Sequence, residues 1–406
     1  MEILNQIRVV DMAQFISGSR CTQILADMGA QVVHIEPPAG EILRLIFQLV
    51  GSGEKNYSVF NRNKYGMAVD WRKPEGQKVI KDLLAKSDIF VHNLIPGTLE
   101  KYGLGYDEVR RIKADIIYVA ISGFGAKGLH PERAAFDIIA QATSGQFWNN
   151  LDDLTPPSNH WADLLSGAYA AISALLALIH RQNTGQGQFV DVSMQDVLYF
   201  NNYRAMVNKA MGQAGLADLE KTLGRRPEDV LNSGDRMPFY GFFKSTDGKV
   251  AIVAMTPRQW KDLSEIIGRP ELISDPRFSN ILAQIHHHQA AVQIIEEWTS
   301  GLPSETILET LEKKKIPCGL AYGLDEVNED ANLMARGMFE TVQHKTLGAI
   351  EVPGIPYKFS ETPGSVRLPA PELGEHNRKI LKEWLGYSEK DIKRLMKDDI
   401  IQEDQG

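Results

Sequence analysis

The 406-residue chain carries 44 Lys and Arg against 52 Asp and Glu, a formal net charge of −8 with His neutral. This acidic balance argues against nucleic acid as the main partner, because polyanion binding needs a basic surface. A hydrophobic content of 43% with 24% charged residues is typical of a globular protein. The length exceeds one ordinary core, so we expect two domains or one domain with a large insertion.

Cysteine content and apolar runs predict the cellular compartment of the protein. Cys21 and Cys318 are far apart in sequence, which predicts neither a disulfide framework nor a thiolate metal cage and fits a reducing compartment. Glu2, Arg8 and Asp11 interrupt the region where a signal peptide would be apolar. The longest apolar run, 168–179, is too short to cross a bilayer. We expect a cytoplasmic protein without a membrane partner.

The first 125 residues alternate short β-branched runs with helical patterns, which indicates a parallel sheet with crossover helices. The predicted strands are 7–12, 31–35, 67–70, 89–92 and 116–121, and the predicted helices are 22–28, 74–86 and 107–113. The fold class is therefore α/β with a doubly wound start. Such sheets bind ligands at the carboxyl ends of their strands, which directs attention to the loops 13–19, 93–97 and 122–128.

The next residues continue this pattern of strands and helices, and a polar linker then leads to a second, smaller domain. The sequence predicts a long apolar helix, 163–180, a strand, a second helix, and a polar Gly- and Arg-rich linker at 214–238. Beyond the linker, a hairpin turning at Asp247-Gly248 and three helices predict a smaller α/β domain, 239–330. The remaining predicted elements are strand 189–194, helices 195–211, 257–267, 281–298 and 304–315, strands 339–343 and 349–352, and a helical tail 376–396.

The segment 123–128 reads G-x-G-x-x-G and follows a predicted strand, as in dinucleotide-binding proteins. That motif works only when a helix opens at the glycines and directs its N-terminus at the pyrophosphate. Here Leu129-His130-Pro131 follows, and the proline disfavours a helix at this point. We therefore reject a dinucleotide site and keep two alternatives, a tight loop close to some ligand or a purely structural turn.

No metal site is expected. His286, His287 and His288 are consecutive, and on one helix their side chains would spread over roughly 200° of its surface, so they cannot share one ion. We find no His/Glu pair at zinc spacing elsewhere in the sequence.

Asp163 directly precedes the most apolar stretch of the chain, 164–179. An aspartate at the start of a helix is most simply an N-cap, whose carboxylate accepts backbone N–H groups and complements the helix dipole. Periodicity alone therefore supports no catalytic role for this side chain.

Several short segments, each weak alone, together resemble family III CoA-transferases, the group of formyl-CoA and carnitine CoA-transferases and α-methylacyl-CoA racemase. In order they are VVD at 9–11, ADMGAQVV at 26–33, IEP at 35–37, NRNK at 61–64, SGFG at 122–125, DIIAQA at 137–142, AD at 162–163, TGQG at 184–187 and GEH at 374–376. The resemblance covers nearly the whole chain.

The resemblance implies a ring-shaped subunit, two of which interlock into a homodimer, with a large Rossmann-like domain built from both chain ends. It implies that residues 1–213 and 331–406 form this CoA-binding domain around the linker 214–238 and the small domain 239–330. It also implies an enzyme whose substrates are an acyl-CoA and a small carboxylic acid, with no permanently bound cofactor.

By resemblance Asp163 matches the catalytic nucleophile, which passes through an acyl anhydride and an aspartyl-CoA thioester. Positions that match CoA-binding residues are Ser17, Val69, Arg72, Asn93, Leu94, Lys101, Arg133 and Phe136, and supporting positions are Gln14, Ile16, Gly123, Phe124, Gly125 and Asp137. The three basic side chains would meet the nucleotide phosphates. A basic residue that formyl-CoA transferase uses after its second strand is here Pro37, and 232–235 is a candidate acceptor-binding loop.

Three other functions remain open at this point. A racemase needs a proton-transfer pair, and the matching positions are Phe136 and Thr256, neither of which exchanges a proton in that role. A CoA-binding protein without turnover would not need Asp163. A dinucleotide-dependent reductase conflicts with the broken glycine motif.

Overall fold

The computed structural model describes residues 2–49, 53–147, 155, 157–223 and 240–402. The chain divides into two compact units: unit 1 comprises residues 1–205 and 332–406, and unit 2 comprises residues 206–331. Unit 2 is thus an insertion between two separate parts of unit 1.

Unit 1 contains a six-stranded parallel sheet in the order β3-β2-β1-β4-β5-β6. The strands are β1 Arg8–Asp11, β2 Gln31–Glu36, β3 Lys64–Ala68, β4 Ile89–His92, β5 Ile117–Ser122 and β6 Gln188–Ser193. All six overlap predicted strands, although β3 begins three residues before the predicted strand 67–70 and ends two residues before its end, and the α/β class is confirmed. The strand order reverses direction between β1 and β4, which is where a doubly wound sheet forms its crevice.

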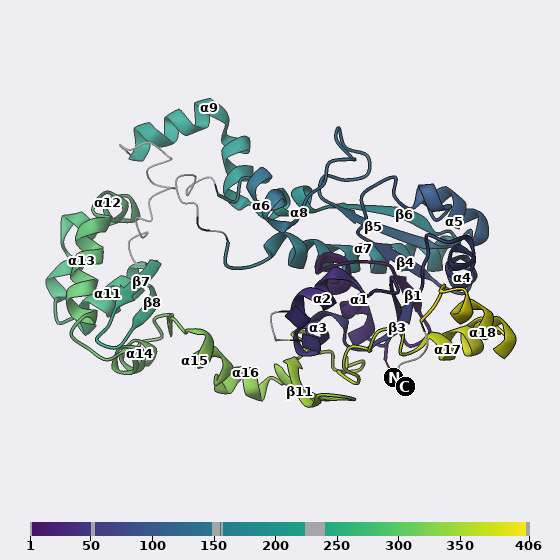
Figure 1. Ribbon diagram of the computed structural model, residues 1–406. Coiled ribbons are helices and arrows are strands. Elements are labelled where there is room, and N and C mark those ends of the chain that lie inside the picture. Colours follow the sequence, from purple (N-terminus) through teal and green to yellow (C-terminus); the bar gives the residue numbers. More distant parts are fainter. Residues whose placement is uncertain (1, 50–52, 148–154, 156, 224–239, 403–406) are drawn as a thin grey trace. The chain divides into compact units, whose positions relative to one another are not determined.

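Helices cover both faces of this sheet (Figure 1). They are α1 Ser17–Asp27, α2 Ile42–Leu49, α3 Gly53–Asn61, α4 Pro74–Leu84, η1 Glu100–Tyr102, α5 Tyr106–Ile112, α6 Asp137–Thr143, α7 Trp161–Thr184 and α8 Met194–Asn201. Alternate strand residues face opposite sides, so Val9 packs with α1, α7 and α8, whereas Val10 packs with α4, α5 and the C-terminal helices. The two faces therefore form two separate apolar cores.

The C-terminal part of unit 1 closes the β3 edge. It contains the antiparallel hairpin of β10 Phe339–His344 and β11 Gly348–Pro353, then α17 Asn377–Lys379, a π-helical turn Ile380–Trp384 and α18 Glu389–Lys397. Asn377 Oδ1 accepts the backbone N–H of Ala68 at 3.0 Å, and Arg44 donates to the Pro371 carbonyl at 2.9 Å. The tail predicted as one helix is thus three short segments.

Other helix boundaries differ from the prediction. Helix α1 begins at Ser17 rather than Thr22, and α2, α3 and α6 were not predicted. The helix predicted over 195–211 ends at Asn201, because Asn202 leaves the helix and its side chain caps the next one, accepting the Ala205 N–H at 3.1 Å. The helical segment α9, Tyr203–Leu223, is broken at Gly212, whose φ of 60° and ψ of −177° are not helical. Its second part covers 214–223, where an irregular linker was expected; residues 224–238 lie outside the described part.

Helix α7 is long and apolar enough to cross a membrane by length and composition, contrary to the expectation from the shorter run 168–179. Its small residues Gly167, Ala170 and Ala174 are buried against α1 and the sheet. Near its end Arg181 pairs with Asp88 at 3.0 Å. These contacts favour a core helix of unit 1.

Unit 2 has an antiparallel sheet of β7 Tyr240–Lys244, β8 Lys249–Val253 and β9 Cys318–Leu320. Its helices are α11 Pro257–Ile266, η2 Pro270–Ile273, η3 Pro276–Phe278, α12 Ile281–His286, α13 His288–Thr299, α14 Ser304–Lys313 and α15 Leu324–Asn328, and α16 Ala331–Ala335 follows at the boundary. The helix predicted over 281–298 breaks at His287, so His288 is buried while its two histidine neighbours are exposed.

Candidate active site

A cavity of about 1030 Å³ opens at the carboxyl ends of β1, β4 and β5, where the strand order reverses. Ten of the residues singled out in the sequence line it together: Gln14, Ile16, Ser17, Asn93, Leu94, Gly123, Arg133, Phe136, Asp137 and Asp163. All of them belong to unit 1. The loops 13–19, 93–97 and 122–128 each contribute at least one of these residues.

Five predicted positions do not line this cavity: Val69, Arg72, Lys101, Phe124 and Gly125. The Val69 side chain is fully buried in the core. Arg72 pairs with Asp70 at 2.9 Å and is otherwise largely exposed, and Lys101 is exposed in η1. Their roles in CoA binding stay predictions.

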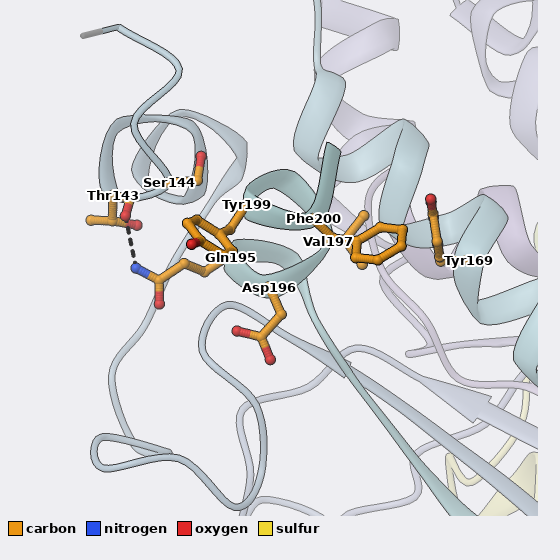
Figure 2. Close-up of a pocket in the computed structure, with 8 residues that line it drawn as sticks. All are labelled: Thr143, Ser144, Tyr169, Gln195, Asp196, Val197, Tyr199 and Phe200. Atoms are coloured by element: carbon orange, nitrogen blue, oxygen red, sulfur yellow. Dashed lines mark hydrogen bonds between the residues drawn. The ribbon is translucent and has the colours of Figure 1, made fainter. Parts of the chain in front are cut away.

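A second hollow of about 600 Å³ lies between α6, α7 and α8 (Figure 2), and Asp163 is not among the residues that line it. Its lining is Thr143, Ser144, Tyr169, Gln195, Asp196, Val197, Tyr199 and Phe200. The rings of Tyr169 and Phe200 meet edge to face at 6.1 Å, and Gln195 donates to the Thr143 carbonyl at 2.9 Å. None of these residues was predicted as a site residue.

Asp163 is the third residue of α7, because the helix begins at Trp161 and its N-cap is His160. The expectation that Asp163 is the N-cap is therefore wrong. The Asp163 backbone N–H is instead satisfied by a side chain from another helix, since Asp137 Oδ1 accepts it at 3.1 Å. The Asp163 carboxylate consequently remains available to the cavity that it lines.

Asp137 is held in place by its neighbours. It is the first residue of α6 and is only 6% exposed. Gln141, one turn later, donates to Asp137 Oδ2 at 2.5 Å and to the Asn159 carbonyl at 3.0 Å, while His160 Nδ1 lies 3.7 Å from the same Oδ2. The loop before α7 is thereby fixed to α6, which sets the position of the first turn of α7.

Burial, and then the negative charge of Asp137, raises the pKa of Asp163 to about 7. Both effects disfavour the ionised carboxylate relative to the neutral acid. A carboxylate whose ionised form is destabilised in this way is a stronger base than an ordinary aspartate, and near neutral pH a substantial fraction of it is still ionised. These properties suit a nucleophile that attacks a thioester.

Asp137, His160 and Asp163 place ligand atoms within 4.8 Å of one another, a spacing compatible with a divalent ion. Both Asp137 oxygens, however, already accept protein hydrogen bonds, from Asp163 and from Gln141. A metal would have to displace these donors. The donor set therefore fits a metal poorly, and the cluster is better explained as a device that positions Asp163.

The glycine-rich loop 123–128 is held by internal contacts, and its first residue, Gly123, lines the cavity. Asp191, on β6, accepts the backbone N–H of Ala126 at 2.9 Å and also that of Lys127, so an internal carboxylate occupies the place that a phosphate would take. Gly125 has φ +83°, which favours glycine, and no helix begins between β5 and α6, a segment that the structure describes throughout. These contacts agree with rejection of a dinucleotide site.

The turn 13–15, which lines the cavity after β1, is fixed by Asn93 from the end of β4. The Asn93 carboxamide accepts the Gln14 N–H at 2.8 Å and donates to the Gln14 carbonyl at 2.6 Å and to Ser17 Oγ at 3.0 Å. Phe15 has φ +58°, an uncommon conformation for a residue with a side chain. Its N–H donates to Glu41 Oε2 at 3.0 Å, which holds this conformation.

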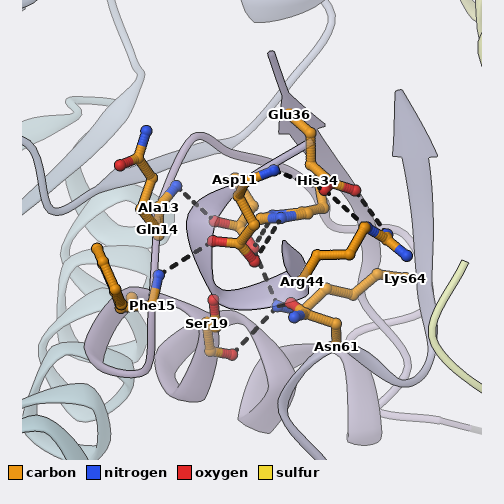
Figure 3. Close-up of polar contacts among 12 residues, drawn as sticks. Asp11, Ala13, Gln14, Phe15, Ser19, His34, Glu36, Arg44, Asn61 and Lys64 are labelled. Carbon is orange, nitrogen blue, oxygen red and sulfur yellow. Dashed lines mark hydrogen bonds and ion pairs between the residues drawn. The ribbon is translucent and has the colours of Figure 1, made fainter. Parts of the chain in front are cut away.

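Beneath this turn lies a buried network of charged groups (Figure 3). His34 Nδ1 is 3.0 Å from Asp11 Oδ2, and its Nε2 is 3.6 Å from Glu41 Oε1. Lys64 lies 3.0 Å from the same Asp11 oxygen. Burial opposes a charge on His34, but Asp11 and Glu41 outweigh it and raise the pKa of His34 to about 9. The network was not predicted, because its members come from four separate segments.

Comparison with known proteins identifies the family. Residues 4–377 match the sequence profile described as CoA-transferase family III. The chain is 33% identical over 98% of its length to formyl-CoA:oxalate CoA-transferase of Streptomyces avermitilis, covering 99% of that protein. It is 31% identical to succinyl-CoA–D-citramalate CoA-transferase of Chloroflexus aurantiacus, with 98% of each chain covered, and 31% identical to succinyl-CoA:glutarate CoA-transferase of Mus musculus, with 99% and 91% covered.

Comparison with solved structures supports the same family. A CaiB/BaiF family protein from Brucella suis superposes with a TM-score of 0.76 at 27% identity, covering 94% of this chain and 99% of that one. Rv3272 from Mycobacterium tuberculosis superposes with a TM-score of 0.78 at 25% identity, covering 93% and 98%. The chain therefore belongs to CoA-transferase family III, the CaiB/BaiF group. It is a CoA-transferase, and its substrates are CoA thioesters.

Proposed function

We propose that this enzyme transfers CoA through covalent intermediates on Asp163. The carboxylate attacks the acyl-CoA carbonyl, the C–S bond breaks, and a mixed anhydride and CoA thiolate result. The thiolate attacks the aspartyl carbonyl of the anhydride, which releases the donor acid and leaves an aspartyl-CoA thioester. The acceptor carboxylate then attacks that thioester, which breaks its C–S bond and gives a second mixed anhydride and CoA thiolate. The thiolate attacks the acceptor carbonyl of this anhydride, forming the new acyl-CoA and releasing the Asp163 carboxylate.

The observation that carries this proposal is the place of Asp163: it lines the cavity from the first turn of α7, with its backbone N–H held by Asp137 and its pKa raised. Helix N-terminal N–H groups nearby would favour the negative charge that develops in each step. Arg133 and Asn93, which line the same cavity, would contact the CoA arm. We also propose that the enzyme is a cytoplasmic homodimer.

Racemisation by the same family is the alternative, and the residues argue against it. Phe136 has no ionisable group. The Thr256 hydroxyl is the N-cap of α11, where it accepts the Gln259 N–H at 3.2 Å in a capping box, so its position has a structural explanation.

Mass measurement of the intact protein after brief mixing with an acyl-CoA tests the mechanism. We expect a covalent acyl or CoA adduct on the wild type, located at Asp163 by peptide mapping. The Asp163→Asn variant should form none and should lose roughly 10⁴-fold or more of the transfer rate. An active Asp163→Asn enzyme, or an adduct located elsewhere, would refute the mechanism.

A further inference from the structure

The wall of the cavity beside Asp163 is largely apolar. Side chains from the turn after β1, from α2 and α3, and from the start of α6 form it: Phe15, Ile46, Phe47, Phe60, Phe136 and Ile138. Ile46 is 40% exposed and Phe136 is 62% exposed, so a ligand in the cavity can cover apolar surface that water now contacts. Burial of such surface contributes roughly 25 cal/mol per Å².

The charged groups of the same lining are few and mostly acidic. Among the described residues that line the cavity, Asp137 and Asp163 are the carboxylates and Arg133 is the one arginine or lysine. The Arg133 guanidinium stacks 4.8 Å above the Phe124 ring, which lies outside the lining. A second carboxylate would lie at the end of the acyl group away from the carbon that reacts at Asp163, against the apolar wall. The basic side chains of the lining are Arg133, which is assigned to the CoA arm, and His160. An unpaired buried charge costs several kcal/mol.

The aromatic part of the wall is formed before any ligand binds. Phe15 and Phe136 meet edge to face at 5.3 Å. Phe15 occupies this position with a left-handed backbone, and the Glu41 carboxylate that accepts its N–H is itself only 2% exposed. Backbone strain that a buried network maintains at a ligand cavity points to a functional position for the side chain.

We infer that the acyl group bound in this cavity is apolar at its far end: an aromatic, branched or medium-chain monocarboxylate rather than a dicarboxylate. The inference rests on the proposed function, because it assumes that the acyl carbon reacts at Asp163. It separates this enzyme from the similar proteins, whose names specify oxalate, citramalate and glutarate.

Calorimetric binding to the Asp163→Asn protein tests the inference without turnover. Hexanoyl-CoA and adipoyl-CoA have acyl chains of equal carbon number and differ in the terminal carboxylate. We expect hexanoyl-CoA to bind at least tenfold more tightly. Equal binding, or tighter binding of adipoyl-CoA, would overturn the inference.

Wild-type kcat/KM for the acceptors hexanoate and adipate should show the same order. The two proposals fail separately: an active Asp163→Asn enzyme refutes the nucleophile, whereas a preference for the dicarboxyl ligand refutes only the substrate class.

Two variants locate the preference in the wall. Phe15→Ala should weaken binding of hexanoyl-CoA several-fold and leave adipoyl-CoA little changed, whereas Phe15→Leu, which keeps an apolar side chain, should restore most of the difference. Ile46→Lys adds a cation at a half-exposed lining position and should move the preference toward adipoyl-CoA. A preference that neither Phe15→Ala nor Ile46→Lys alters would show that this wall does not contact the acyl group.

Discussion

The Oδ1 atom of Asp137 accepts the backbone N–H of Asp163 at 3.1 Å, so one acidic side chain both binds the first turn of helix α7 and lies beside the candidate nucleophile. The same contact orients the main chain of Asp163 and raises the energy of its ionised carboxylate. Asp137 from α6 therefore positions Asp163 and also contributes to its raised pKa, for which burial is the larger cause.

The pH dependence of transfer should report this pair. Because the pKa of Asp163 is raised to about 7, the rate should increase with pH through neutrality and then level off as the carboxylate ionises. Asp137→Asn keeps an oxygen acceptor but removes the charge, so the rising limb should move to lower pH. Burial is the larger cause of the shift, so the movement should be partial. An unchanged limb in the pH profile of kcat would exclude charge coupling between the two residues.

Asp163→Asn should be more stable than the wild type above neutral pH. The pKa of Asp163 is higher in the folded protein than its ordinary value of 3.8, so the stability that protonation contributes is complete below about pH 4 and is lost as pH rises through 7. Asparagine does not titrate. We expect its melting temperature to exceed that of the wild type by roughly 2–6 °C at pH 8, but hardly at pH 4. A lower melting temperature at pH 8 would show that the ionised Asp163 carboxylate stabilises the fold, contrary to this expectation.

Deprotonation of His34 should lower the stability of the fold at alkaline pH. Its pKa is raised from 6.5 to about 9, so the stabilisation by Asp11 and Glu41 is complete below pH 6.5 and is lost as pH rises through 9. Denaturant titrations between pH 6 and 10 should show this loss. His34→Gln should be less stable at pH 6 and show less dependence on pH. Parallel curves for the two proteins would mean that His34 is not the titrating group.

The proposed homodimer, with the interlocked ring-shaped subunits that the family resemblance implies, predicts that subunits do not exchange freely, because such rings must open or unfold to separate. Three apolar side chains on one face of α7, Ile172, Leu176 and Ile179, are more than 50% exposed in the single chain, as expected of a surface that another chain covers. Two differently tagged pools, purified separately and mixed under native conditions, should remain unmixed for hours. Rapid appearance of doubly tagged dimers would count against interlocking.

The sheet and the loops of the cavity were predictable because their signals are local. Runs such as 89–92 are apolar on both faces, as buried parallel strands are, and proline marks the start of α4. The helices α2 and α3 were missed, since glycines at 51 and 53 interrupt the pattern between them. The link from Asp137 to Asp163 joins residues far apart in sequence, so no local pattern could have indicated it.

Helix α7 also shows, for a single residue, that local sequence does not predict tertiary contacts. Asp163 was recognised as important, but its capping role was misassigned, because the exact first residue of a helix depends on tertiary partners such as Asp137. The network around His34 was invisible for a similar reason: its charges come from β1, β2, β3 and the segment before α2.

The return of the chain end to β3 has a consequence for biosynthesis. Strand β3 is synthesised early, yet its neighbours Asn377 and Ile401, which bond Ala68 and pair with Val69, leave the ribosome last. The β3 edge of the nascent sheet therefore stays uncovered while about three hundred further residues are translated. An exposed strand edge invites pairing with other chains, so the interval before release is when this polypeptide most needs a chaperone.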